Sequence, residues 1–110
     1  MKSSKSATYI APAIASRIVE FQNDGDLPPH VLLENTGLTA SAAIRYQESD
    51  NGSNWTDIAN TAGTVLPGES NQQLIVSTKA RLALYAQGNT PLNVTVSKQV
   101  NGSPTNLGVA

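Results

Sequence analysis

The chain contains no cysteine and few charged residues, and these two shortages exclude several kinds of site. Without cysteine there is no disulfide framework, no thiolate metal site and no cysteine nucleophile. Charged residues make up 14% of the chain, with seven Lys plus Arg against eight Asp plus Glu. The cations are scattered singly along the sequence, whereas binding to phosphates requires several of them together. We therefore expect no nucleic acid among the partners of this protein.

Long apolar runs and helical periodicity are missing as well. No apolar stretch approaches the length of about eighteen residues that spans a bilayer, so we expect no membrane partner. No window repeats apolar residues at positions i, i+3, i+4 and i+7 without an interruption by Pro, Gly or a β-branched cluster. The sequence therefore predicts a single small domain built without helices.

Apolar and polar residues alternate with period two in several short stretches. This alternation places Ile44 and Tyr46 on one face of a strand, and Leu82 and Leu84 on one face of another. Strands are expected at 18–21, 31–34, 44–47, 55–58, 74–76, 81–84 and 92–97, separated by turns rich in Gly, Pro, Asn and Asp. This spacing predicts an all-β fold: a single antiparallel β-sandwich, immunoglobulin-like or jelly-roll, of about seven or eight short strands.

The two ends of the chain lack this alternation. Residues 1–16 are rich in Ser and Ala, and residues 101–110 are similarly irregular. We therefore divide the chain into an extended N-terminal arm (1–16), a β-sandwich domain (17–100) and a C-terminal tail (101–110), and expect the domain to fold without the arm. The arm and the start of the domain are expected to contact a partner or a neighbouring subunit through Tyr9, Ile10, Pro12, Ile14 and Arg17.

No group of residues stands out as catalytic. His30 follows Pro28 and Pro29 at the start of an expected strand, and we favour a loop or edge position for it. A Ser-His-Asp triad need not be contiguous in sequence and stays open on that ground, but no Gly-x-Ser-x-Gly elbow is present. Neither a carboxylate pair nor a phosphate-binding Gly-rich loop can be singled out. We expect a protein that is not an enzyme and has no cofactor.

The segment from Asp50 to Asn54 lies between two expected strands, which predicts a hairpin with a Gly-containing loop. Its Asp and Asn oxygens, together with Asp57, are of the kind that calcium prefers. However, the EF-hand spacing is missing, and Asn, Asp and Gly are also the residues that a tight loop requires. We favour turn chemistry here and at residues 24–26, and expect no metal site.

The aromatic residues have two alternative interpretations. Trp55, Tyr46, Tyr85 and Phe21 would suit a platform on which sugar rings stack, or they would fill the core. Aromatics are only 5% of the chain, and a small sandwich needs most of them for its interior, so we favour the core. Solvent exposure of Trp55 would favour the sugar-binding alternative.

Two stretches resemble known β-sandwich proteins. The run from Tyr46 to Ile58 is similar to the hairpin Ser-Asp-x-Gly-x-x-Trp-Thr-x-Ile of many extracellular and virion domains. Further on, Val65 to Ser70, Leu74 to Val76 and Ala80 to Gly88, followed by the strand at 92–96, resemble the later half of small decoration proteins of tailed bacteriophage capsids. The second resemblance spans about residues 29–98.

This resemblance implies a non-enzymatic virion protein located on the capsid surface. Such a decoration or cement protein would be a homo-oligomer, dimeric or trimeric, that bridges neighbouring subunits of the major capsid protein and stabilises the shell. The alternative is a β-sandwich module of a virion or extracellular fibre that binds a glycan or another feature of a host surface.

Overall fold

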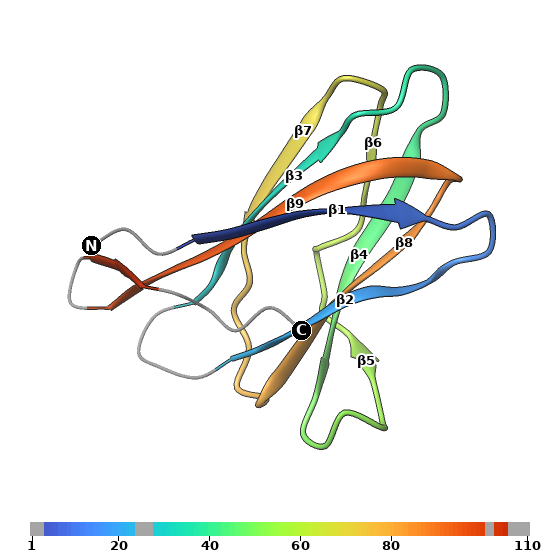
Figure 1. Cartoon of the computed structure of the whole chain (residues 1–110). Helices are drawn as coiled ribbons and strands as arrows, with labels where there is room; N and C mark the ends of the chain where they lie inside the picture. Colours follow the sequence, from blue (N-terminus) through green and yellow to red (C-terminus); the bar gives the residue numbers. More distant parts are fainter. Residues whose placement is uncertain (1–3, 24–27, 101–102, 106–110) are drawn as a thin grey trace.

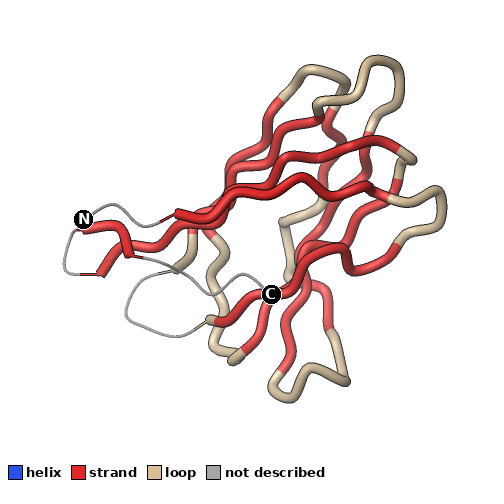
Figure 2. The backbone as a smooth tube through the Cα atoms, in the orientation of Figure 1, coloured by secondary structure: helices blue, strands red, loops and turns tan. Residues whose placement is uncertain are grey.

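The computed structural model describes residues 4–23, 28–100 and 103–105, and these ranges contain strands and no helix (Figures 1 and 2). Accordingly, no helix in the described part of the chain is long and apolar enough to cross a membrane. The ten strands in these ranges are β1 (Ser4–Ala11), β2 (Ser16–Gln22), β3 (His30–Asn35), β4 (Ala42–Ser49), β5 (Thr56–Asp57), β6 (Gly63–Val65), β7 (Ser70–Leu74), β8 (Arg81–Gln87), β9 (Thr90–Val100) and β10 (Ser103–Thr105). The predicted all-β, antiparallel sandwich is confirmed.

Two sheets form the sandwich (Figure 1). The first sheet has the order β1-β9-β3-β7, with β10 pairing to β9, and the second has the order β2-β8-β4-β5, with β6 pairing to β4. Strands β1 to β4 alternate between the two sheets along the chain, and so do β7 to β9. Alternation of this kind is the jelly-roll arrangement, so the structure selects the jelly roll from the two sandwich types that the sequence left open.

The core lies between the two sheets and is filled by alternate side chains of their strands, as the period-two pattern predicted. Its buried members are Ala11, Val31, Leu33, Leu92, Val94 and Val96 from the first sheet, Val19, Phe21, Ala42, Ile44, Tyr46, Val65, Leu82, Leu84 and Ala86 from the second, and Ile75 just after β7. Full burial of a Val, Leu, Ile or Phe side chain contributes roughly 1.5–3 kcal/mol. One layer of such side chains therefore supplies most of the driving force for folding.

The N-terminal residues differ from the expectation of an arm outside the sandwich. Ser4–Ala11 form β1 and pair with β9, from Ser4 opposite Ser97 to Ala11 opposite Thr90. Tyr9 packs against the core, whereas the Ile10 side chain is 61% exposed. The sequence shows no clear alternation here because Ala and Ser fill half of this segment and contrast little between an inner and an outer face. Its partner strand also lies at the other end of the chain, so no local pattern reveals the pairing.

Other strands also begin or end at residues that differ from those expected from the sequence. The strand expected at 74–76 covers Ser70–Leu74 instead, because it is a polar strand at the edge of the first sheet and carries little apolar signal. Neither β6 nor β10 was predicted, and β10 uses Ser103–Thr105 of the expected C-terminal tail. The rest of that tail, at 101–102 and 106–110, and the expected turn at 24–26 lie outside the described residues.

The pairing of β1 with β9 changes what a truncation should do. Deleting residues 1–11 removes an edge strand of the first sheet and uncovers the core beneath Tyr9 and Ala11. We expect the shortened chain to lose its cooperative thermal transition, which circular dichroism measures. A melting temperature equal to that of the full chain would restore the interpretation of this segment as an arm.

Tyr46 provides a second test of the core. Its hydroxyl is buried without a hydrogen-bond partner in the described structure, and burial raises the pKa of this phenol. Tyr46→Phe removes the unsatisfied hydroxyl and keeps the ring, so we expect the free energy of unfolding at neutral pH to increase by about 1 kcal/mol. A less stable Phe variant would show instead that the hydroxyl is satisfied.

The raised pKa also sets the sign of a pH effect. The stability that depends on protonated Tyr46 is complete below the usual tyrosine pKa of about 10 and is lost as pH rises above it. Urea titrations near neutral pH and near pH 11 should therefore show a larger alkaline loss of stability in the parent chain than in the Phe variant. The two chains differ only at position 46, so the comparison isolates the contribution of the Tyr46 hydroxyl.

Candidate binding face

The outward side chains of the second sheet gather arginine, aromatic and amide groups. In the sheet register, Tyr85 on β8 lies opposite Arg17 on β2 and also opposite Arg45 on β4, so these three side chains form one row. Gln47 and Asp57 are paired in the next row. We call the resulting surface the arginine–aromatic face, and it consists of Arg17, Arg45, Gln47, Trp55, Asp57 and Tyr85.

A β-bulge accounts for the position of Arg17. The register between β2 and β8 shifts between Arg17 and Val19, where Ile18 is the extra residue. In a regular strand Arg17 would share a face with Val19 and Phe21, which are both buried in the core. The bulge turns Arg17 to the outer face instead, since an extra residue reverses the alternation.

Arg45 is held from two sides. Its guanidinium carbon lies 4.3 Å from the centroid of the Tyr85 ring, and its Nε donates a 3.0 Å hydrogen bond to Asp57 Oδ1. Gln47 Nε2 donates to the same oxygen at 2.7 Å. This Gln47 hydrogen bond, followed by the charge and hydrogen bond of Arg45, lowers the pKa of the Asp57 carboxyl. Asp57 therefore becomes protonated only at a lower pH than an ordinary aspartate, and its carboxylate keeps Arg45 oriented.

Trp55 is placed by the loop between β4 and β5. Its indole Nε1 donates to the carbonyl of Gly52 at 3.1 Å, and the guanidinium carbon of Arg17 lies 5.1 Å from its ring. Within the loop, Asn51 Oδ1 accepts from the backbone N–H groups of Ser53 and Asn54, and Gly52 has a φ of 77°. The predicted hairpin and the turn chemistry of its loop are thus confirmed.

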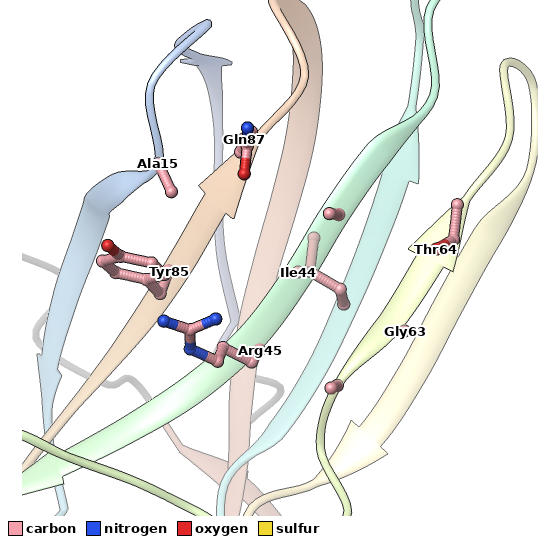
Figure 3. A pocket seen from close by; sticks show the side chains of 9 residues that line it. Ala15, Ile44, Arg45, Gly63, Thr64, Tyr85 and Gln87 are labelled. Carbon is pink, nitrogen blue, oxygen red and sulfur yellow. The ribbon is translucent and has the colours of Figure 1, made fainter.

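An open groove of about 350 Å³ lies beside this row of side chains (Figure 3). We call it the Tyr85 groove, and it is lined by Ala15, Ala43, Ile44, Arg45, Ala62, Gly63, Thr64, Tyr85 and Gln87. Figure 3 shows Arg45 and Tyr85 reaching toward each other from neighbouring strands. Most of the other lining side chains are small, which leaves the groove open, and its volume falls at the lower end of small-ligand sites.

The aromatic residues divide between the two alternatives weighed from the sequence. Phe21 and Tyr46 are buried in the core, as favoured. The preference for the core was wrong for Trp55 and Tyr85, which are half-buried on the outer face under arginine side chains. Tyr85 alternates with the buried Leu84, so its outward direction follows from the strand period, and this signal was present in the sequence.

The residues predicted to contact a partner do not share one surface. Tyr9 packs against the core, and Ile10 lies on the exposed side of β1. The Pro12 carbonyl accepts hydrogen bonds from the β8–β9 turn, and Ile14 is 83% exposed in the loop between β1 and β2. Of the five, Arg17 alone belongs to the arginine–aromatic face. Arg45, Gln47 and Asp57 were missed, because the sequence does not show that they meet.

His30 lies in the first sheet, away from the arginine–aromatic face. His30 begins β3 in the first sheet, and its Nε2 lies 3.1 Å from Gln72 Oε1. Its hydrogen-bond partner is thus an amide and not a carboxylate or a serine. Among the residues for which a position is given, no group of three or more His, Asp or Glu side chains is arranged to hold a metal ion.

Comparisons with known proteins bear on the fold only. No protein-family model matches the chain, and no curated protein matches its sequence. The structure is similar to the crystal structure of PirA, with a TM-score of 0.56 and 16% identity over 87% of this chain and 93% of that one. A mitogen derived from Yersinia pseudotuberculosis is aligned with a TM-score of 0.49 and 8% identity, over 94% of this chain and 95% of the other. None of these matches connects the chain with capsid decoration proteins.

Proposed function

We propose that this protein is a non-enzymatic binding module that recognises a glycan on a host or particle surface through the arginine–aromatic face. The observation that carries the proposal is the position of Trp55 and Tyr85. Both rings lie on the outer face of the second sheet and not in the core, where a sandwich this small would gain more from burying them.

The chemistry of the face suits a sugar. Saccharides present hydroxyl groups that both donate and accept hydrogen bonds, and Gln87 and Thr64 offer matching amide and hydroxyl groups in the groove. Arginine adds a planar set of donors in a fixed geometry. Because the side chains stand on paired strands and hold one another, little conformational entropy is lost when a ligand binds.

Binding to an array of surface glycans tests this proposal. We expect the full chain to retain a subset of glycans, and Trp55→Ala and Tyr85→Ala to weaken retention about tenfold or more, as for aromatic anchors of other interfaces. Leu74→Ala is the matched control, because Leu74 is 62% exposed on the first sheet, away from this face. Equal retention by all four chains, at equal melting temperature, would place the binding elsewhere.

A second candidate function, capsid decoration, is supported by an apolar surface at one end of the sandwich. Ile14, Leu38 and Leu66 are 83%, 92% and 49% exposed in the β1–β2, β3–β4 and β6–β7 connections. Hydrogen bonds tie the β1–β2 connection to the β8–β9 turn (Gly88 N to Pro12 O), the β3–β4 connection to β9 (Thr36 N to Pro91 O) and the β6–β7 connection to β3 (Gly68 N to Asn35 O). Large exposed apolar side chains on the loops at one end of a fold are typical of contacts with another protein.

In this second proposal the loop end binds across subunits of a major capsid protein, and the protein acts on the virion surface as a homo-oligomer. Many weak contacts would add up over the shell. Particles that lack the protein should release their genome at a lower temperature, and purified protein should restore stability even near half-molar salt, because apolar contacts are little screened. Leu38→Ser should fail to restore it. Stripped particles of unchanged heat stability would contradict this function.

A further inference from the structure

We propose that the Tyr85 groove is selective for an acidic saccharide, whose carboxylate binds the guanidinium of Arg45. The proposal rests on the glycan-binding function and assigns the class of sugar. It distinguishes a uronic or sialic acid residue from a neutral sugar at the same position.

The Arg45 side chain covers one face of the Tyr85 ring. A neutral sugar usually stacks its apolar face on a free aromatic ring, but here the Arg45 guanidinium lies 4.3 Å from the Tyr85 centroid and occupies one ring face. Arg45 and Tyr85 both line the groove, with the guanidinium stacked on one face of the ring (Figure 3). A group of opposite charge gains from the stacked cation, whereas a neutral ring finds that face of Tyr85 already covered by Arg45.

Arg45 has N–H groups that remain free to donate hydrogen bonds to a ligand. Its Nε is used by Asp57, and neither of its terminal Nη nitrogens has a hydrogen-bond partner in the described part of the chain. The two Nη groups carry most of the five N–H donors of a guanidinium, and paired donors of this kind bind a carboxylate through two parallel hydrogen bonds. Asp57 orients the guanidinium without using that edge.

The charged side chain in the groove lining is a cation, which favours an anionic ligand. Arg45 is the one charged residue among the nine that line it. Arg17 adds a second cation in the same row, beyond Tyr85, and forms no ion pair with a described residue. Glu20 on β2 lies one row further away, opposite Ala83. Asp57 pairs with Arg45 through Nε but, like Glu20, does not line the groove, so Arg45 is the charged group that a carboxylate in the groove contacts.

The remaining lining fits a single sugar ring. Ala43, Ala62 and Gly63 leave an open floor, while the Thr64 hydroxyl and the Gln87 amide offer polar contacts for ring hydroxyls. A pyranose acid carries its carboxylate and hydroxyls on one compact ring, which matches a groove of about 350 Å³. An acidic peptide is the competing ligand, but an extended peptide usually binds along a strand edge, and this groove lies on a sheet face.

Matched ligands test the proposal with the full chain. Methyl glucuronide and N-acetylneuraminic acid are titrated by NMR against methyl glucoside and against the methyl ester of the glucuronide. We expect the acids to bind about tenfold or more tightly than their neutral counterparts, as charge-assisted hydrogen bonds do, and high salt to reduce the difference.

Arg45→Gln should abolish the preference for acids, and Arg45→Lys should restore only part of it, because lysine lacks the paired donors. Arg81→Gln is the matched control, since it removes one positive charge from the same strand as Tyr85, four residues along β8. All variants should melt near the parent temperature, because the Arg45–Asp57 ion pair is exposed and contributes little to stability.

The outcomes distinguish a failure of acid selectivity from a failure of glycan binding. If acidic and neutral sugars bind equally, or if Arg45→Gln keeps the preference, acid selectivity is overturned while glycan binding stands. If no saccharide binds here or on the array, the glycan function falls as well. If a glutamate-rich peptide binds more tightly than the acidic sugars and depends on Arg45, the saccharide class is overturned in favour of a peptide.

Discussion

The side chain of Asn35 joins the two sheets at one end of the sandwich, and the other connections there are arranged around it. It is fully buried, and its Nδ2 donates to the carbonyls of Ala40 and Val65 while its Oδ1 accepts from Gly37 N and Thr90 Oγ1. The Val65 carbonyl and the Thr90 hydroxyl bind Asn35 in buried positions, so both would lose a hydrogen bond away from water if Asn35 were absent. One amide thus links β9 of the first sheet to β6 of the second and closes the loop between β3 and β4.

The β8–β9 turn lies at this same end of the sandwich and passes close to the β3–β4 loop. Gly88 in the β8–β9 turn has a φ of 145°, and a Cβ atom at this position would lie 2.3 Å from the Ser41 carbonyl oxygen. A glycine is therefore required where the turn passes the β3–β4 loop. With β8 and β9 held there, each occupies an inner position of its own sheet, and the core forms between them.

Burial of the inner faces leaves the outer face of the second sheet available for recognition. The strands fix its spacing, and the hydrogen bonds and ring contacts between Arg45, Tyr85, Gln47 and Asp57 fix its side chains. Function is proposed at two places with different chemistry: a polar and cationic sheet face suited to a glycan, and an apolar loop end suited to a protein. The fold shared with PirA is compatible with both and decides between neither.

The sequence alone determined the class of the fold and much of its core. Period-two alternation predicted the strands around Ile44, Leu82 and Val94, and the residues from Asp50 to Asn54 predicted the hairpin, because side-chain direction and turn geometry are local properties. Tertiary structure alone decided that Ser4–Ala11 is a strand, since its partner β9 is distant in sequence. It also decided that Arg17 faces outward, because a bulge reverses the period, and that Arg45 meets Tyr85, because sheet register is set by packing of the whole core.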